Sequence, residues 1–381
     1  MQADVPLVNF APLLRLSLLV LLIALGPLAL VWLRQRGRNT SARLAALTAL
    51  TLFLTFDLVV FGSFTRLTDS GLGCPDWPGC YGHVSPVGAS AHIQAAEAAI
   101  PDGPVTPTKA WIEMIHRYLA MTVGLLILVM TIAAWWDRKT LPYSPLWPTL
   151  TLAWVIVQGL FGKYTVTLKL YPAVVTAHLL GGMVLLALLV RQHVAWKGAQ
   201  FDLPAGLRRL LLASMAVLSL QLALGGWVST NYAVLACTGF PQCNDQWWPA
   251  MNFAQGFTLL RELGMTASGE VMSMEALVAI HMTHRLFAWA VVGAVTLLAW
   301  RLWQLQGGRG RRWAWTLWAL VLWQLGSGLS NVVLGWPLAA ALGHSAGAAA
   351  LVCVTTWLWC VSATASPYFA RSPAARSLTS A

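Results

Sequence analysis

The sequence CPDWPGC at residues 74–80 returns in modified form as CTGFPQC at residues 237–243. Each copy is followed by a His-Arg dipeptide, which begins at His116 in the first case and at His284 in the second. Corresponding positions lie 163 residues apart at the cysteines and 168 residues apart at the His-Arg pairs. A long-period repeat of this kind indicates an internal duplication with small loop insertions.

Histidines further along the chain follow the same repeat. Gln158 precedes His178 by twenty residues and Gln324 precedes His344 by twenty, so these two pairs lie 166 residues apart. The four repeated histidines, two in each half, all fall in apolar stretches. An ionisable group is costly in such a stretch, so a functional role is the default interpretation.

The composition places the chain in a membrane. It is 58% hydrophobic and only 10% charged, whereas about a quarter of the residues in a soluble domain are charged. Nine apolar runs are long enough, at roughly 20 residues each, to cross about 30 Å of hydrocarbon. These runs begin near Pro12, Leu44, Trp111, Leu146, Ala173, Leu210, Ala276, Trp313 and Leu338.

The predicted fold is an all-α polytopic membrane protein with two pseudo-symmetric four-helix bundles and one extra N-terminal helix. Residues 1–43 form the extra helix and a basic cytoplasmic link, residues 44–200 and 201–365 form the bundles, and residues 366–381 form a cytoplasmic tail. The first helix begins as early as a targeting segment would. Because residues 1–10 carry no Lys or Arg and the apolar run is long, we expect a true membrane span.

The basic residues predict the orientation. If the Arg-rich residues 34–43 are cytoplasmic, 16 Lys and Arg residues fall on that side and 4 on the other. The N-terminus is then outside and the C-terminus inside. This asymmetry at the lipid bilayer explains the net charge of +11, so no nucleic-acid partner is needed.

Both cysteine pairs fall in loops on the predicted outer side, where thiols oxidise and stay oxidised. We therefore expect the disulfides Cys74–Cys80 and Cys237–Cys243. A metal site is disfavoured because neither loop contains a CxxC pair and His83 has no counterpart in the second loop. A redox shuttle at the first pair remains open.

The four repeated histidines suit haem iron, which takes two axial imidazoles. His116 and His284 lie in the first turns of helices that enter from the outer side, and His178 and His344 lie at a similar depth. Small residues three and four positions after each distal histidine leave room for a porphyrin or serve plain helix packing. The alternative is that each histidine only bridges helices by hydrogen bonds.

Arginines follow two of the predicted ligands directly. The guanidinium groups of Arg117 and Arg285 suit a haem propionate, since Arg pairs well with carboxylates. Arg66, at the start of the first cysteine loop, is a third candidate. The competing interpretation is a structural ion pair between Arg117 and Glu113, which are four residues apart on one helix.

The two halves differ beside the proximal histidines. Glu113 lies three residues before His116, and His281 lies three residues before His284, so each occupies the helix face of its ligand. A carboxylate at this point can accept a proton or stabilise developing positive charge. This difference predicts that the Glu113 half is catalytic and that the other half transfers electrons.

Several runs closely resemble the haem A synthase family. They are TRLT at residues 65–68, SGLGCPDWP at 70–78, EMIHR at 113–117, GGWVSTN at 225–231 and HMTHR at 281–285. The resemblance covers the whole duplicated region. It implies an oxidoreductase that converts the methyl group of haem O to the formyl group of haem A through a hydroxymethyl intermediate, for cytochrome c oxidase.

The resemblance also implies specific roles. His116 and His178 would hold the substrate haem, His284 and His344 would hold a resident haem b, and Glu113 would be catalytic. The family is expected in the bacterial inner membrane with its haem sites toward the periplasm, and its first-loop cysteines are associated with a disulfide.

Partners are implied as well. They are haem O synthase, the cytochrome c oxidase assembly machinery and an electron acceptor, while a homo-oligomer is left open. The sequence contains no nucleotide-binding loop, so the acceptor is a haem, a quinone, a disulfide or another protein. The alternatives are a di-haem membrane cytochrome for quinol-linked electron transfer and a non-catalytic haem-handling assembly factor.

The chain departs from the family pattern in three places. Residues 1–38 add a helix to which the pattern assigns no role. Residues 83–108 and 244–274 extend the two cysteine loops, and their Pro, Gly and polar content predicts irregular or partly helical caps.

Overall fold

A computed structural model describes residues 6–101, 103–141, 143–197, 201–306 and 308–362. Within these residues the backbone is mainly helical, and β-pairing is confined to isolated bridges. The elements are α1 (Leu13–Arg34), α2 (Thr40–Leu67), α3 (Ser90–Ala99), α4 (Pro107–Trp136), α5 (Leu146–Thr167), α6 (Pro172–Lys197), α7 (Ala205–Thr230), the 3₁₀ turn η1 (Ala233–Leu235), α8 (Phe253–Gly256), α9 (Met274–Trp303), α10 (Gly308–Val333) and α11 (Leu338–Val361).

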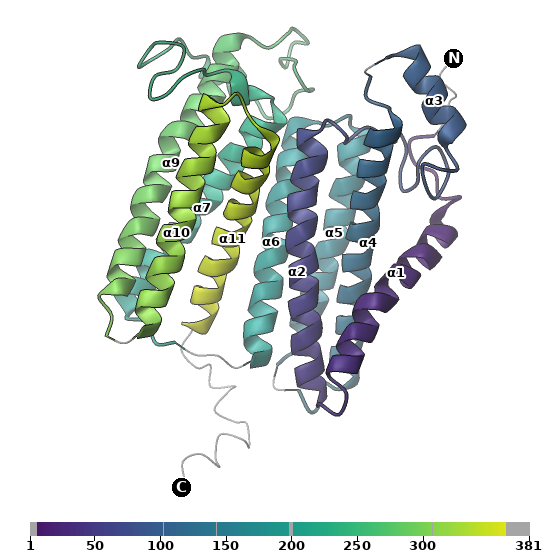
Figure 1. Cartoon of the computed structure of the whole chain (residues 1–381), viewed down its shortest axis with the longest axis vertical. Helices are drawn as coiled ribbons and strands as arrows, with labels where there is room; N and C mark the ends of the chain where they lie inside the picture. The colour runs from purple at the N-terminus through teal and green to yellow at the C-terminus, as the bar shows by residue number, and fades with distance from the viewer. Residues whose placement is uncertain (1–5, 102, 142, 198–200, 307, 363–381) are drawn as a thin grey trace.

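The long helices pack in two groups of four (Figure 1). Helices α2, α4, α5 and α6 form one group, and α7, α9, α10 and α11 form the other. The groups meet where α2 and α6 contact α11 and where α6 contacts α7. The extra helix α1 packs against α4 and α2 from outside the first group. This architecture agrees with the predicted fold class, while the origin of the two groups by duplication stays a prediction.

Each group has its own apolar core. In the first, α4 contributes Leu126, Ile127 and Met130, whose spacing of one, three and four places them on one helix face. In the second, α9 contributes Val295 and Leu298 in the same way. The cores join at the interface of the groups, where Val190 and Val194 of α6 belong to the second core and Met183 of α6 packs in one cluster with Ala349 of α11.

Among the described residues, seven helices are long and apolar enough to cross a membrane. They are α1, α2, α4, α6, α7, α9 and α11. All nine predicted runs are helical, but α5 and α10 fall outside this set, because polar residues and tryptophan lower their mean hydropathy. The chain is thus a multi-pass membrane protein.

Both cysteine loops, together with α3 and α8, lie at the same end of the molecule (Figure 1). The predicted partly helical caps are confirmed by α3 within residues 83–108 and by α8 within residues 244–274. Capping side chains then start the two long helices: the Thr106 hydroxyl accepts the N–H of Lys109, and the Ser273 hydroxyl accepts that of Ala276. These caps fix where α4 and α9 begin, and so set the depth of the histidines that follow.

Candidate functional site

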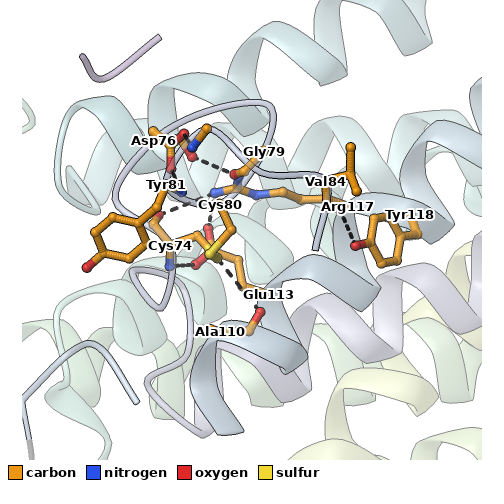
Figure 2. Close-up of a disulfide and its surroundings, with 11 residues drawn as sticks. Cys74, Asp76, Gly79, Cys80, Tyr81, Val84, Ala110, Glu113, Arg117 and Tyr118 are labelled. Carbon is orange, nitrogen blue, oxygen red and sulfur yellow. Dashed lines mark hydrogen bonds and ion pairs between the residues drawn. A yellow bond between two sulfur atoms is a disulfide. The ribbon is translucent and has the colours of Figure 1, made fainter. Parts of the chain in front are cut away.

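The first disulfide loop sits directly on the outer turns of α4, with Glu113 beneath it (Figure 2). The predicted disulfide between Cys74 and Cys80 is present, and both cysteines are fully buried. One Glu113 carboxylate oxygen accepts the Cys74 N–H at 2.8 Å, and the other forms an ion pair with Arg117. With only 4% of its surface exposed, Glu113 is held by the loop and by its own helix.

Arg117 braces the same loop from below (Figure 2). Its guanidinium donates to the carbonyl oxygens of Asp76 at 2.8 Å, of Cys74 at 3.4 Å and of Gly79. The structural ion pair with Glu113 is therefore observed, and most of the guanidinium donors serve the loop. The predicted contact of Arg117 with a haem propionate finds no support in this arrangement and stays a prediction.

The Asp76 carboxylate closes the loop on itself. It accepts the N–H groups of Tyr81 at 2.5 Å and Gly82 at 2.8 Å. Burial, followed by the negative charge of Asp76, raises the pKa of the Tyr81 hydroxyl above its ordinary value. The loop is thus tied internally as well as to α4.

The second loop is built alike but lacks the carboxylate. The predicted disulfide between Cys237 and Cys243 is present. Arg285 donates to the carbonyl oxygens of Gln242 at 3.0 Å and Gly239 at 3.2 Å, as Arg117 does in the first loop. His281 is buried in the place that corresponds to Glu113, and its Nδ1 has no hydrogen-bond partner. The predicted difference between the halves is therefore observed: Glu113 lies beneath the first loop, and His281 occupies the corresponding position at the second.

Each repeated histidine rests against a glycine of a neighbouring helix. A Cβ atom added at these glycines would meet the imidazole at between 2.9 and 3.6 Å. The contacts join His116 of α4 to Gly62 of α2, His178 of α6 to Gly162 of α5, His284 of α9 to Gly225 of α7, and His344 of α11 to Gly328 of α10. In both halves, each imidazole therefore packs against a glycine of the neighbouring helix, and these four contacts are called the glycine cradles.

The four imidazoles form one pair in each half. His116 and His178 lie within electrostatic range of each other, and so do His284 and His344. Nδ1 of His178 and of His284 has no hydrogen-bond partner. Within the described residues no cluster of three or more His, Cys, Asp or Glu side chains forms a metal site. Two imidazoles per half fit an iron whose other four ligands come from a porphyrin.

The small residues after the distal histidines do not leave open space at every position. A Cβ atom at Gly181 would lie 1.9 Å from Gln158 Nε2, and one at Gly347 would lie 2.2 Å from Gln324 Nε2. Gln324 also donates to the His344 carbonyl oxygen at 2.9 Å. Gln side chains occupy the space beside these two glycines, which agrees with the helix-packing alternative, and room for a porphyrin there stays a prediction.

Arg66 is engaged between the two groups of helices. Its guanidinium donates to the Ser229 carbonyl oxygen, pairs with Asp69 at 3.2 Å and lies 3.7 Å from the centroid of the Tyr232 ring. The Tyr232 hydroxyl donates to the same Asp69 carboxylate at 2.6 Å. Arg66 therefore joins the end of α2 to the end of α7, and its predicted propionate contact stays a prediction.

The sequence interpretation missed Arg261. This side chain, in the loop between α8 and α9, is 3% exposed and donates to the Asn231 side chain and, at 3.4 Å, to the Met265 carbonyl oxygen. Its Nε has no hydrogen-bond partner, and no carboxylate in the described part of the chain forms an ion pair with it. Burial lowers the pKa of the guanidinium from its ordinary value. A buried cation normally has a counter-ion. The sequence gives no signal of the missing partner, because Glu262 follows Arg261 directly.

Fold and site together define a class: a helical membrane protein with an imidazole pair suited to haem in each half and a buried carboxylate in one half only. A sequence profile of the family described as "Cytochrome oxidase assembly protein" matches residues 45–356. The chain therefore belongs to the haem A synthase family.

Similar proteins carry the name Heme A synthase. The chain is 37% identical to that of Shewanella oneidensis over 326 residues, which covers 83% of this chain and 97% of the relative. It is 27% identical to that of Rhizorhabdus wittichii over 333 residues, covering 81% and 90% of the two chains. For that of Caulobacter vibrioides the identity is 27% over 325 residues, covering 80% and 91%.

Proposed function

We propose that this chain oxidises the methyl group of haem O to the formyl group of haem A, through a hydroxymethyl intermediate, for the maturation of cytochrome c oxidase. Family membership supports the activity. The observation that carries the assignment to one half is the buried Glu113 carboxylate, fixed by the Cys74 N–H and by Arg117 one turn from His116. The second half has His281 instead, which supports a redox role there.

The histidines take the corresponding roles. His116 and His178 would hold the substrate haem, and His284 and His344 would hold a resident haem b. When bound, haem b would supply a one-electron redox centre. The glycine cradles and the unpaired imidazole nitrogens support this assignment. Arg261, a buried cation that pairs with no carboxylate among the described residues, joins Arg285 as a candidate for a haem propionate of the second half.

The overall change is balanced when one water enters: the methyl group and water give the formyl group, four protons and four electrons. Positive charge develops beside the porphyrin as electrons leave, and a fixed carboxylate stabilises it. Glu113 also can accept one of the released protons at its carboxylate oxygens. The loop covers Glu113 from the outer side, so the carboxylate is kept from bulk water.

Further parts of the proposal concern the surroundings. Haem O synthase would supply the substrate, and the oxidase assembly machinery would take the product. The sites would face the periplasm of a bacterial inner membrane, with the N-terminus outside and the C-terminus in the cytoplasm. A haem, a quinone, a disulfide or another protein would accept the electrons, and the chain would act alone or as a homo-oligomer.

The experiment supplies haem O to the expressed full chain and identifies the extracted haems by mass. The wild type should yield hydroxylated haem O and haem A. Glu113→Gln should keep its haem yet lose product by about 100-fold or more, since one carboxylate supplies charge stabilisation of that order. Glu275→Gln, an exposed carboxylate at the start of α9, is the control and should behave as wild type.

The outcomes separate the alternatives. Unchanged haem with rapid electron transfer from a quinol would favour the di-haem cytochrome. Haem binding with neither oxidation nor electron transfer would favour the assembly factor. Loss of bound haem in Glu113→Gln would mean that Glu113 acts through the structure of the loop and not in the chemistry.

A further inference from the structure

The residues that precede the family match form a close contact with the first disulfide loop. The match begins at residue 45, so α1 and the residues before it are additions to the matched region. Backbone hydrogen bonds join the two segments: Asn9 N–H donates to the Trp77 carbonyl oxygen at 2.9 Å, and Trp77 N–H donates to the Leu7 carbonyl oxygen at 3.0 Å. Residues 7–16 are called here the N-terminal segment.

Side chains of the N-terminal segment fill the outer surface of that loop. Pro12 is buried, and a Cβ atom added at Gly79 would lie 2.8 Å from its Cγ. A Cβ atom at Gly82 would lie 2.9 Å from the Asn9 amide nitrogen. Such distances leave no space for water between the segment and the loop, so the cover is continuous at these points.

The segment also reaches the disulfide itself. Leu16 has no exposed surface and belongs to a buried cluster that includes Cys74, Cys80 and Met114. Leu16, Val20 and Ala24 recur every four residues and are the buried residues of α1, so one stripe of this helix faces the protein. Leu28 and Val31, further along α1, pack against the core of the first group.

Among the residues that the structure describes, no other segment covers the second loop in this way. Thr238, Gly239, Phe240 and Pro241 are all exposed, and Phe240, which occupies the position of Trp77, is 45% exposed. In the first loop, by contrast, Pro78 and Gly79 are buried, although the cysteines of both disulfides are buried alike. The two loops therefore share their cysteine spacing and their contacts with an arginine. They differ in that the N-terminal segment covers the first loop.

The contacts continue from the segment to the carboxylate. Trp77 holds the segment, its neighbour Asp76 and the nearby Gly79 accept from Arg117, and Arg117 pairs with Glu113. Displacing the loop outward would therefore remove the Cys74 N–H that donates to Glu113 and the carbonyl oxygens that hold Arg117.

We propose that the N-terminal segment clamps the first disulfide loop, so that it shields the Cys74–Cys80 bond from reductants and holds Glu113 in position. The positioning part rests on the proposed role of Glu113. The shielding part depends only on the structure and is measured without activity.

The test measures the reduction of each disulfide in the purified full chain. After timed exposure to a water-soluble phosphine, free thiols are alkylated and each cysteine peptide is quantified by mass spectrometry. Asn9→Pro removes one backbone donor, and Leu16→Ala opens a space beside the disulfide. Each should accelerate reduction of Cys74–Cys80 by about five- to tenfold, since a single hydrogen bond or contact of this kind shifts a local opening equilibrium by that factor.

Two controls are contained in the same chain. Reduction of Cys237–Cys243 should keep its wild-type rate in both variants, because the segment does not touch that loop. Leu14→Ala, at a residue that is 73% exposed, is the matched control for Leu16→Ala and should leave both rates unchanged. The haem spectrum shows whether each variant is folded, and if Asn9→Pro does not fold, Leu16→Ala carries the test.

Three results would overturn the proposal. They are an unchanged first-loop rate in the folded variants, equal acceleration of both disulfides, and an intact mass showing that the mature protein lacks the N-terminal segment. Haem A formation is measured in parallel and should fall in the variants with accelerated reduction. If the wild type makes no haem A, the proposed function fails, yet the reduction rates still decide whether the segment shields the loop.

Discussion

Gly225→Ala tests whether the glycine cradles place the haem ligands. The added Cβ atom would lie 2.9 Å from His284 Cε1, while ordinary contact begins near 3.4 Å, so the ring or the helix must move by about 0.5 Å. Metal sites tolerate displacements only up to about this size, and disturbing a residue that orients a metal ligand costs about 10- to 100-fold in affinity. We therefore expect the affinity of the proposed haem b site in the second half to fall by that factor.

The assay compares the pyridine haemochrome and the reduced-minus-oxidised spectrum, each per mole of protein, with the wild type. Gly293→Ala on α9 is the matched control, because nothing lies within 4 Å of its added Cβ atom. This control should keep its haem and gain about 0.5–1 kcal/mol of stability from the better helix former. Gly62→Ala, whose Cβ atom would lie 3.0 Å from His116 Nε2, should instead affect the haem of the first half.

The reasoning is refuted if Gly225→Ala retains wild-type haem content with an unchanged spectrum. It is also refuted if Gly225→Ala and Gly62→Ala lose both haems equally while their folded fractions match that of Gly293→Ala. The first result would mean that the imidazole does not need this position. The second would mean that the two cradles do not serve separate sites.

Three further predictions concern buried charges and the outer contacts. Arg117→Met should cost about 3–5 kcal/mol of unfolding free energy, because it leaves the Glu113 carboxylate buried without its partner. In thermal unfolding, the double variant Arg117→Met/Glu113→Gln should recover part of this loss. Strictly additive effects of the two substitutions would contradict the coupling between the two residues. Arg261→Gln should weaken haem retention about tenfold or more, as loss of one charge-assisted hydrogen bond implies, and an unchanged haem content would exclude the propionate contact. Burial, ahead of the hydrogen bond to Asp69, raises the pKa of Tyr232 to about 12. Because the unfolded chain releases this proton near pH 10, stability should fall between about pH 10 and 12, and Tyr232→Phe should remove that part of the decline in melting temperature.

Much of the architecture was predictable from local pattern. Apolar runs of membrane-spanning length gave the nine long helices, and loop spacing with compartment gave both disulfides. These features depend on residues close together in the sequence. The ion pair between Glu113 and Arg117, which the sequence offered as the competing interpretation, is of the same kind, since the two residues lie one turn apart on α4.

The features that escaped prediction join distant parts of the chain. Helical periodicity shows which face is apolar but not which helix it meets, so the contact of each imidazole with a glycine on another helix was not visible. The backbone pairing of residues 7–9 with Trp77 leaves no side-chain pattern, because main-chain groups form both hydrogen bonds. The same limit explains why the contacts of Arg117 and Arg285 with loop carbonyl oxygens were not predicted.

The contact that joins the ends of α2 and α7 has a consequence for how the chain arose. Arg66 and Ser229 are 163 positions apart, as are Asp69 and Tyr232, and this is also the spacing of the two cysteine loops. On the duplication that the sequence predicts, each of these residues touches its own counterpart, which occurs only beside a twofold axis. On that duplication, a homodimeric ancestor would have placed two copies of the same residue against each other at each of these positions. Fusion into one chain would remove that constraint and let each position acquire a complementary partner.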